Sequence, residues 1–307
     1  MSKIAFIFPG QGAQICGMGQ DFYEQTETAK EIFDKASEIL GFSMPELCFE
    51  KNDRLDITEY TQPAMVTASI AMMKVFMERT GITPSVAAGL SLGEYPAMAA
   101  AGVMSAEDAI RTVRQRGILM QEAVPVGEGA MAAILALDAA AIEAVTGAME
   151  GVWIANYNCP GQIVISGKKA AVEEACEKLK AAGAKRALLL NVSGPFHSGM
   201  LTVAGEKLAQ VLADVEIHTP RIPYVANVNA QFVTTAEPVK DLLTRQVSSS
   251  VRWQQSVEAM INDGVDTFIE IGPGRTLAGF MKKISKEVKT MNVEKLEDIE
   301  KVAEALK

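Results

Sequence analysis

Residues from which metal and disulfide sites are built are scarce in this sequence. Four cysteines are spread over 307 residues with no C-x-x-C pair, and only two histidines are present. A zinc site or a disulfide framework requires such residues in clusters, so we expect no metal centre and reduced thiols. These residues are Cys16, Cys48, Cys159, Cys176, His197 and His218.

Long apolar runs and an excess of basic residues are also missing. No run approaches the roughly 20 apolar residues that span a bilayer, and the opening run at residues 4–8 is too short and too poorly flanked for a signal peptide. We therefore expect a cytoplasmic protein that does not enter membranes. The net charge is -9, from 29 basic and 38 acidic residues. This balance argues against general nucleic-acid binding, because phosphates are neutralised by clustered Lys and Arg.

What is present is typical of a globular protein. Hydrophobic residues make up 49% and charged residues 22%, close to the usual composition of about 45–50% and about 25%. At roughly 150 residues per domain, the chain allows about two domains or one large domain with an insertion. The sequence contains no internal repeat and no low-complexity segment.

The first part of the chain has the element order of an α/β core. The apolar run at residues 4–8 predicts a buried strand that opens into a glycine-rich loop. Helical patterns cover residues 21–40 and 62–79, and a short strand at residues 86–89 leads into Ser91 and a further helix. Strand, tight turn and helix in this order predict a layered core with a parallel sheet.

The middle of the chain has a different pattern, in which short strands alternate with helices. We expect strands at residues 130–137, 152–157, 162–166 and 184–191, with helices at 138–148 and 169–182. The order βαββαβ is that of a ferredoxin-like unit. We therefore predict a small ferredoxin-like subdomain at residues 126–191, inserted into a large α/β catalytic domain of residues 1–125 and 192–307. A cleft between the two is a common place for a ligand.

The last part returns to the pattern of the large domain. Strands are expected at residues 223–227 and 267–271, and a helix near residues 239–246. Apolar residues from Val293 to Leu306 recur at helical spacing with charges between them, which predicts a helical tail.

The sharpest motif is Gly89-Leu90-Ser91-Leu92-Gly93, a G-x-S-x-G between a predicted strand and a predicted helix. This is the context of a nucleophile elbow, where small flanking residues allow a sharp turn and the serine hydroxyl lies among backbone N–H groups at a helix N-terminus. The motif predicts Ser91 as a nucleophile on an α/β-hydrolase-like core. The alternative is a serine N-cap with glycines that serve packing.

A serine nucleophile needs a base, and the two histidines are the leading candidates. His197 lies in Gly194-Pro195-Phe196-His197-Ser198, a loop of the sort that presents side chains to a site. His218 lies shortly before Pro220 and is typical of a surface connector. We therefore predict His197 as the base, with a structural or solvated histidine as the alternative.

The glycine-rich loop after the first strand offers backbone donors. The N–H of Gln11, beside that of Leu92, could stabilise a developing oxyanion and lower the barrier by several kcal/mol. Gly10-x-Gly12 is also the start of a dinucleotide fingerprint, but Ile15 stands where the third glycine belongs. Nucleotide binding is therefore the weaker interpretation.

Three arginines lie on one predicted helix, residues 106–121, and any of them could bind an anion. We expect Arg111 and Arg114 to face solvent, as charged helical residues commonly do. Arg116 could instead point into the cleft, where a guanidinium matches a carboxylate in bidentate geometry. Spacing alone does not choose among the three.

With these motifs in order, the sequence resembles the malonyl-CoA:acyl-carrier-protein transacylase family of type II fatty acid synthesis. The resemblance covers nearly the whole chain, and seven motifs in the family's order are far more specific than any one of them. They are Phe8-Pro9-Gly10-Gln11-Gly12, Thr61-Gln62-Pro63-Ala64, Gly89-Leu90-Ser91-Leu92-Gly93-Glu94-Tyr95, Gln115-Arg116-Gly117, Asn156-Tyr157-Asn158-Cys159-Pro160-Gly161-Gln162, Gly194-Pro195-Phe196-His197-Ser198 and Glu270-Ile271-Gly272-Pro273-Gly274.

The resemblance implies an acyl transfer in two steps without a cofactor. Ser91 takes malonyl from malonyl-CoA as a serine ester, and the phosphopantetheine thiol of acyl carrier protein then takes it from Ser91. His197 acts as base in the first step and activates the thiol in the second. We expect such a protein to work as a monomer.

The resemblance also implies roles for four further residues. The N–H groups of Gln11 and Leu92 would form the oxyanion hole, and Arg116 would hold the free carboxylate of malonyl. Gln246 falls where the family has a glutamine whose main-chain carbonyl orients the histidine, in place of the aspartate of a triad. A thiolate is a good leaving group, so a weaker partner for the imidazolium suffices.

One position departs from the family pattern. Most members have histidine where this sequence has Leu90, and an apolar side chain there removes a polar contact from the cleft floor. We expect an effect on acyl preference or rate rather than loss of the nucleophile. Phe196 resembles the malonyl-selecting version of its loop, so malonyl remains the expected acyl group.

An acidic carrier protein would need a local basic surface on a chain of net charge -9. One candidate is the cluster Lys282, Lys283, Lys286 and Lys289, and the other is Lys185 with Arg186. A solvated helix face is the commoner meaning of such runs.

Two other functions remain open at this point. A serine esterase or thioesterase would use the same pair of serine and histidine, and Arg116 as a carboxylate clamp would discriminate against it. An acyltransferase-like scaffold without catalysis would need neither the pair nor the arginine, so the intact set argues against that function.

Overall fold

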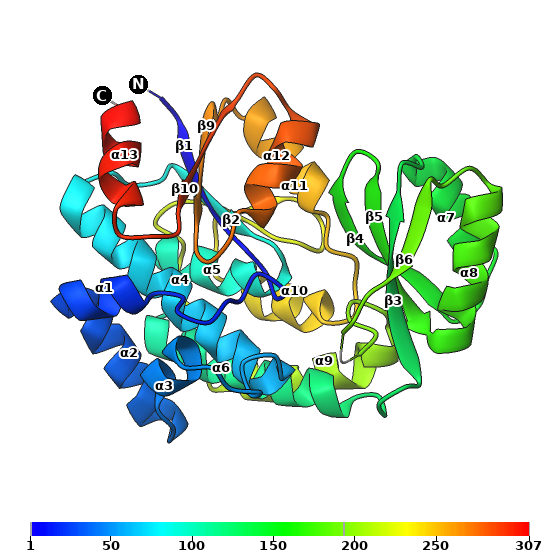
Figure 1. Cartoon of the computed structure of the whole chain (residues 1–307), viewed down its shortest axis with the longest axis horizontal. Coiled ribbons are helices and arrows are strands. Elements are labelled where there is room, and N and C mark those ends of the chain that lie inside the picture. Colours follow the sequence, from blue (N-terminus) through cyan, green and yellow to red (C-terminus); the bar gives the residue numbers. More distant parts are fainter. Residues whose placement is uncertain (1, 193, 307) are drawn as a thin grey trace.

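The structure is a computed structural model that describes residues 2–192 and 194–306. The chain forms two units, each built around its own sheet (Figure 1). The larger unit holds a mostly parallel sheet with helices around it, and the smaller unit holds a separate antiparallel sheet. The predicted α/β class with a parallel sheet is therefore confirmed. No helix within the described residues is long and apolar enough to cross a membrane.

The sheet of the larger unit has six strands, of which the last, β8, runs antiparallel to its neighbour. In order across the sheet they are β10 (Lys289–Val293), β9 (Thr267–Ile271), β1 (Ile4–Phe8), β2 (Val86–Gly89), β7 (Tyr224–Val225) and β8 (Phe232–Val233). Helices cover β1 from both faces, so its residues 5–8 are all buried, which explains the continuous apolar run.

The register of β1 and β2 determines where the site forms. Phe8 pairs with Gly89, so the two parallel strands end side by side at the same edge of the sheet. The loop with Gln11 and the turn with Ser91 therefore leave the sheet together. Loops at the carboxyl ends of adjacent parallel strands are the usual place for a ligand in an open α/β sheet.

Helices pack around this sheet along most of the remaining chain. They are α1 (Gln20–Gln25), α2 (Glu27–Leu40), α3 (Met44–Phe49), α4 (Thr58–Thr80), α5 (Glu94–Ala100), α6 (Ala106–Glu122), α9 (Thr202–Ala213), α10 (Val239–Gln246), α11 (Trp253–Asn262), α12 (Thr276–Ile284) and α13 (Asp298–Ala305). Short 3-10 turns occupy Ser91–Gly93 and Gly199–Leu201. The long helix α4 is buried through most of its length, including polar residues such as Thr61, Gln62 and Ser69.

Two predicted helices are wrong in their extent. The helix expected at residues 21–40 is two helices, because Thr26 is extended and caps α2 by accepting a hydrogen bond from the N–H of Ala29 at 3.3 Å. The helix expected from residue 293 begins only at Asp298. Val293 instead ends β10, where it pairs with Ile271 and is fully buried.

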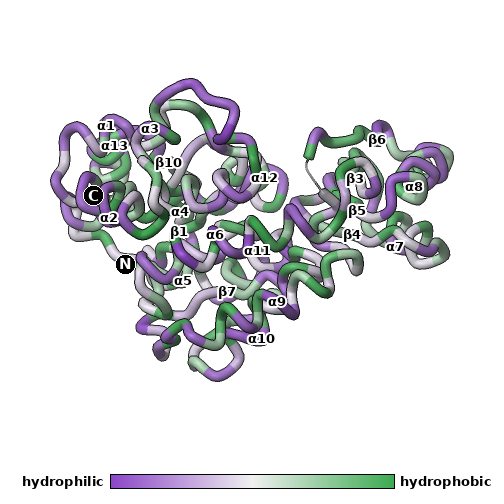
Figure 2. Tube along the Cα trace, turned by 90° about the horizontal axis from the view of Figure 1, so that it is seen from below, coloured by the Kyte–Doolittle hydropathy of each residue, from purple (hydrophilic) through white to green (hydrophobic). Residues whose placement is uncertain are grey.

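The smaller unit has the element order predicted from the sequence. It comprises β3 (Gly129–Leu135), α7 (Ala139–Gly147), β4 (Val152–Cys159), β5 (Gln162–Lys168), α8 (Lys169–Ala181) and β6 (Arg186–Leu189). The strands lie in the order β4-β5-β3-β6 with antiparallel neighbours, and the unit has its own apolar core. In Figure 2 it projects to one side of the larger unit.

Backbone pairing joins the two units. Val251 of the larger unit donates to the carbonyl of Ala155 at 2.7 Å, and its own carbonyl accepts from Tyr157 at 2.9 Å. This pairing holds β4 beside the edge where β1 and β2 end, so side chains of β4 face the same cavity as Ser91.

Candidate active site

The turn after β2 has the geometry of a nucleophile elbow. Ser91 has a left-handed backbone conformation, with φ of 51°, and leads through a 3-10 turn into α5. A Cβ at Gly89 would lie 1.8 Å from the carbonyl oxygen of Gly93, and one at Gly93 would lie 2.2 Å from that of Phe8. Both glycines are therefore required by close approach of backbone to backbone. The predicted context of the motif is present.

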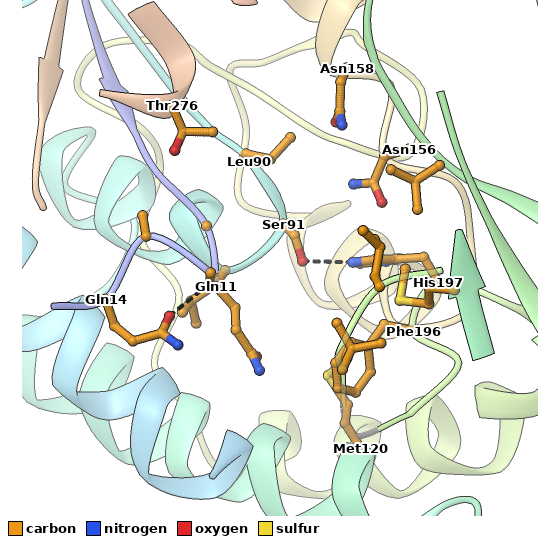
Figure 3. Close-up of a pocket in the computed structure, with 18 of the residues that line it drawn as sticks. Gln11, Gln14, Leu90, Ser91, Met120, Asn156, Asn158, Phe196, His197 and Thr276 are labelled. Atoms are coloured by element: carbon orange, nitrogen blue, oxygen red, sulfur yellow. Dashed lines mark hydrogen bonds between the residues drawn. The ribbon is translucent and has the colours of Figure 1, made fainter. Parts of the chain in front are cut away.

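Ser91 and His197 are in direct contact. The hydroxyl oxygen of Ser91 lies 2.6 Å from Nε2 of His197, and Nδ1 of His197 lies 2.8 Å from the carbonyl oxygen of Gln246 (Figure 3 shows the first of these contacts). A carbonyl oxygen only accepts hydrogen bonds, so Nδ1 carries the proton. Nε2 then offers its lone pair to the hydroxyl of Ser91, which is the arrangement required of a general base.

The surroundings of His197 favour its neutral form. Burial is the main reason that its pKa falls to about 4, and the positive charge of Arg116 lowers the pKa further. The hydrogen bond to Gln246 acts in the opposite direction but does not outweigh burial. The imidazole is therefore uncharged at neutral pH and able to accept a proton.

Arg116 points into the site, as one of the interpretations of its helix allowed. Its side chain is buried, and Nη1 donates to Oε1 of Gln62 at 2.8 Å. Nη2 donates to Oε1 of Gln246 at 3.0 Å and to the hydroxyl of Ser91 at 3.2 Å. Burial lowers the pKa of Arg116, but a guanidinium still remains protonated in a protein. A permanent positive charge thus lies beside the nucleophile.

The other two arginines of α6 differ from each other. The side chain of Arg111 is 58% exposed and forms an ion pair with Asp108, as expected for a residue that faces solvent. The expectation for Arg114 is wrong, because its side chain is only 18% exposed. It forms an ion pair with Glu59 at 2.7 Å and lies over the ring of Tyr60, 4.4 Å from its centroid. Arg114 therefore packs α6 against the start of α4.

Gln11 and Leu92 line the cavity beside Ser91. Within the described residues, the backbone N–H of neither residue donates to another group of the protein. The side chain of Gln11 turns away and donates to Oγ1 of Thr58 at 3.0 Å. Both N–H groups thus remain available to a ligand oxygen, as an oxyanion hole requires.

Two buried residues of the site were not singled out by the sequence. Glu94 follows the elbow on α5 and accepts a hydrogen bond from Nε2 of Gln246 at 2.7 Å. Burial raises the pKa of its carboxyl group to about 7, although the hydrogen bonds and Arg116 oppose the shift. Asn227 follows β7 and contacts Ser91 through its side chain. A lone asparagine after a two-residue strand belongs to no recognisable pattern, so the sequence contains no signal for this residue.

The site opens into a cavity of about 820 Å³ between the two units. Asn156 and Asn158 face it from β4, opposite Ser91 (Figure 3). Amide side chains can both donate to and accept from an amide-bearing ligand. The apolar lining includes Leu90, Met120, Met131, Val164, Phe196 and Phe280. His218, by contrast, does not line the cavity, and its side chain is 55% exposed.

Comparison with known proteins places this geometry in a family. The family model of the acyl transferase domain matches residues 5–299, which defines the class of the protein. A Bacillus subtilis (strain 168) protein named malonyl CoA-acyl carrier protein transacylase is 50% identical over 100% of this chain and 98% of its own. A Staphylococcus aureus (strain MRSA252) protein of the same name is 44% identical over 97% of this chain and 98% of its own.

Solved structures agree with the sequence comparison. An acyl carrier protein S-malonyltransferase from Vibrio cholerae has a TM-score of 0.95 at 43% identity, covering 98% of this chain and 100% of its own. A malonyl-transacylase solved in complex with its type II PKS acyl-carrier protein has a TM-score of 0.96 at 42% identity, covering 99% and 100%. The chain belongs to the malonyl CoA-acyl carrier protein transacylase family, as its motifs predicted.

Proposed function

We propose that the protein transfers a malonyl group from coenzyme A to the phosphopantetheine thiol of acyl carrier protein. The observation that carries the proposal is the buried guanidinium of Arg116, 3.2 Å from the hydroxyl of Ser91. A nucleophile and a carboxylate-binding group this close suit a short diacid, with its thioester carbon at Ser91 and its free carboxylate at Arg116. A monocarboxylic acyl group would offer no carboxylate to that buried charge, which then has only the neutral hydrogen-bond acceptors of the site.

In the first step, His197 takes the proton of Ser91 through Nε2 as the hydroxyl oxygen attacks the thioester carbonyl. The negative charge that develops on the carbonyl oxygen is stabilised by the N–H groups of Gln11 and Leu92. When the tetrahedral intermediate collapses, the carbon–sulfur bond breaks. The proton on His197 passes to the departing thiolate, and malonyl remains as an ester of Ser91.

In the second step, the thiol of the carrier protein gives its proton to His197 and attacks the ester carbonyl. The carbon–oxygen bond to Ser91 breaks, and the proton returns to the serine oxygen. The carbonyl of Gln246 holds Nδ1 of His197 throughout, in the place of a triad aspartate. An uncharged partner suffices because a thiolate demands less proton donation than an amine.

The two units would share this work, without a metal or another cofactor. We assign residues 1–125 and 192–307 to a catalytic domain that is hydrolase-like at its elbow, and residues 126–191 to a ferredoxin-like subdomain. The strand order β4-β5-β3-β6 with antiparallel neighbours supports the second assignment. One chain supplies every side chain that the reaction requires, so we expect a monomer. We also expect the protein to work in the cytoplasm.

The experiment is to incubate the protein with radiolabelled malonyl-CoA and to analyse the peptide that bears Ser91 by mass spectrometry. We expect label on Ser91, no label in Ser91→Ala, and movement of the label to the phosphopantetheine thiol when carrier protein is added. Absence of label on Ser91 would refute the proposal. Release of free malonate with the carrier protein left unlabelled would instead identify a thioesterase.

A further inference from the structure

The reactive serine has a backbone conformation that it would not adopt by itself. A non-glycine residue with positive φ is strained and persists only where its surroundings impose it. Ser91 is such a residue, with φ of 51°. The close contacts of Gly89 and Gly93 permit the turn but do not hold the serine in it. Another group must supply that restraint.

The side chain of Asn227 contacts the elbow on both sides of Leu90. Its Oδ1 accepts a hydrogen bond from the N–H of Ser91 at 2.6 Å. Its Nδ2 donates to the carbonyl of Gly89 at 2.7 Å. The single amide thus pairs with the elbow as a neighbouring strand would. Each of its two ends has only one chemically allowed partner there, so the orientation of the amide is determined.

Asn227 is itself held by groups on two other elements. Its N–H donates to Oε2 of Glu94 at 3.2 Å, and its carbonyl accepts from the N–H of Arg252 at 2.9 Å. The residue is fully buried, where hydrogen bonds are stronger than in water. Oε2 of Glu94 also accepts from Gln246, whose carbonyl orients His197. One network therefore restrains both the nucleophile and the base.

We propose that Asn227 is the positioning residue that holds Ser91 in its reactive conformation. Its amide keeps the serine backbone left-handed, so that the hydroxyl meets His197 and the N–H of Leu92 faces the cavity. This inference rests on the proposed function, because it concerns the rate at which Ser91 takes up malonyl. Asn227 need not touch the substrate to have this effect, and it does not line the cavity.

The first test compares Asn227→Ala with Asn229→Ala, an exposed asparagine of the same loop. The readout is the single-turnover rate of malonyl transfer from malonyl-CoA to Ser91, together with KM and the melting temperature. For Asn227→Ala we expect the single-turnover rate to fall about 10- to 100-fold with KM changed less than about threefold, because small displacements of a nucleophile lower the rate. Asn229→Ala should behave like the wild type.

The second test uses Asn227→Asp, which separates positioning from folding. When protonated, the new carboxyl group can accept from Ser91 and donate to Gly89, as the amide does. When ionised, it has no donor for Gly89 and adds a buried charge. We expect the rate of this variant relative to wild type to rise at least about tenfold between about pH 8 and about pH 5. Taking the ratio cancels titration common to both proteins.

The titratable side chain in contact with this position is the carboxyl of Glu94 on α5, which in turn interacts electrostatically with Arg116, Tyr95 and Tyr224. Glu94 is in contact with position 227, so the two carboxyl groups of Asn227→Asp titrate as one pair, and the rise in the ratio reports protonation of that pair. Circular dichroism at both pH values would verify that Asn227→Asp is folded, which keeps the test valid if Asn227→Ala does not fold.

The outcomes are distinct from failure of the proposed function. Wild-type protein that is never labelled by malonyl-CoA would refute that function. Wild-type labelling with an unchanged rate in Asn227→Ala would overturn the role of Asn227. A rate ratio for Asn227→Asp that does not vary with pH, or a loss explained by a lower folded fraction, would overturn it as well.

Discussion

At the scale of single residues, the burial of His197 determines how acylation responds to pH. Its pKa is lowered to about 4, and the neutral imidazole is the form that accepts the proton. Titration of His197 should therefore lower the acylation rate only near pH 4, and a smaller change near pH 7 would report the carboxyl group of Glu94, whose pKa is raised to about 7. An exposed histidine would lose half of its basic form near pH 6.5. The acylation rate at malonyl-CoA concentrations well below KM reports the free protein and checks the prediction. Loss of most of the rate with a midpoint near the ordinary histidine value would contradict it.

Arg116 should decide which acyl groups are accepted. Arg116→Ala removes the buried partner of the malonyl carboxylate, so we expect malonyl transfer to fall about 100-fold or more. Acetyl transfer should be spared or increased, because acetyl has no free carboxylate and no buried charge then remains unpaired. Rates with malonyl-CoA and acetyl-CoA measure the difference.

Arg111→Ala is the matched control, because Arg111 lies on the same helix with its side chain 58% exposed. It should leave both acyl transfers unchanged. An equal loss for the two acyl groups in Arg116→Ala would remove Arg116 from the recognition of the carboxylate.

At the scale of elements, β1, β2 and the start of α5 meet so closely that the backbone at Gly89 lies against the backbone at Gly93. A methyl group at Gly89 would lie 1.8 Å from a carbonyl oxygen, which no side-chain movement can relieve. Gly89→Ala should therefore lower the free energy of unfolding by at least about 3 kcal/mol. Urea unfolding measures the change, and a loss below about 1 kcal/mol would show that the junction can relax.

Gly279→Ala is the corresponding control on α12. This glycine is exposed in a helix, and an added Cβ would meet nothing within 4 Å. The substitution should raise the free energy of unfolding by up to about 1 kcal/mol, because alanine has the higher helix propensity. The same residue change should thus have opposite signs at the two positions.

The type of a helix or strand could be predicted where its pattern of apolar residues is long and regular. The residues at which elements begin and end were predicted less well. The strand at residues 4–8 has the predicted bounds, because a doubly covered parallel strand is apolar throughout. The division at Thr26 was missed, since a threonine at a cap differs from one inside a helix only in its hydrogen bonds. Val293 was assigned to a helix because one apolar residue fits both a helix and a paired strand.

At the scale of the whole molecule, the net charge of -9 makes approach of an acidic partner depend on local charge. Lys282 and Lys283 are exposed in the last turn of α12, which lines the cavity with Thr276 and Phe280. Lys289 does not join them, because it lies in β10 and donates to the carbonyl of Ala305.

Reversing the two charges in Lys282→Glu/Lys283→Glu should raise KM for the carrier protein about tenfold at low salt and much less at high salt. Acylation by a malonyl thioester without phosphates, such as malonyl-N-acetylcysteamine, should be unchanged. Lys185→Glu/Arg186→Glu makes the same charge change on the smaller unit and is the control. A larger effect from the control pair would place docking on that unit instead.

The class of fold, the elbow motif and the candidate base could be predicted from the sequence alone. These signals are local: G-x-S-x-G requires a sharp turn between strand and helix, and two histidines leave little choice of base. The resemblance implied Arg116, although its spacing on the helix did not select it, whereas the pairing of Asn227 with Ser91, 136 residues away, is seen only in the folded chain. Such contacts follow from how β2, α6 and β7 pack together, and side-chain periodicity along one element does not contain that information.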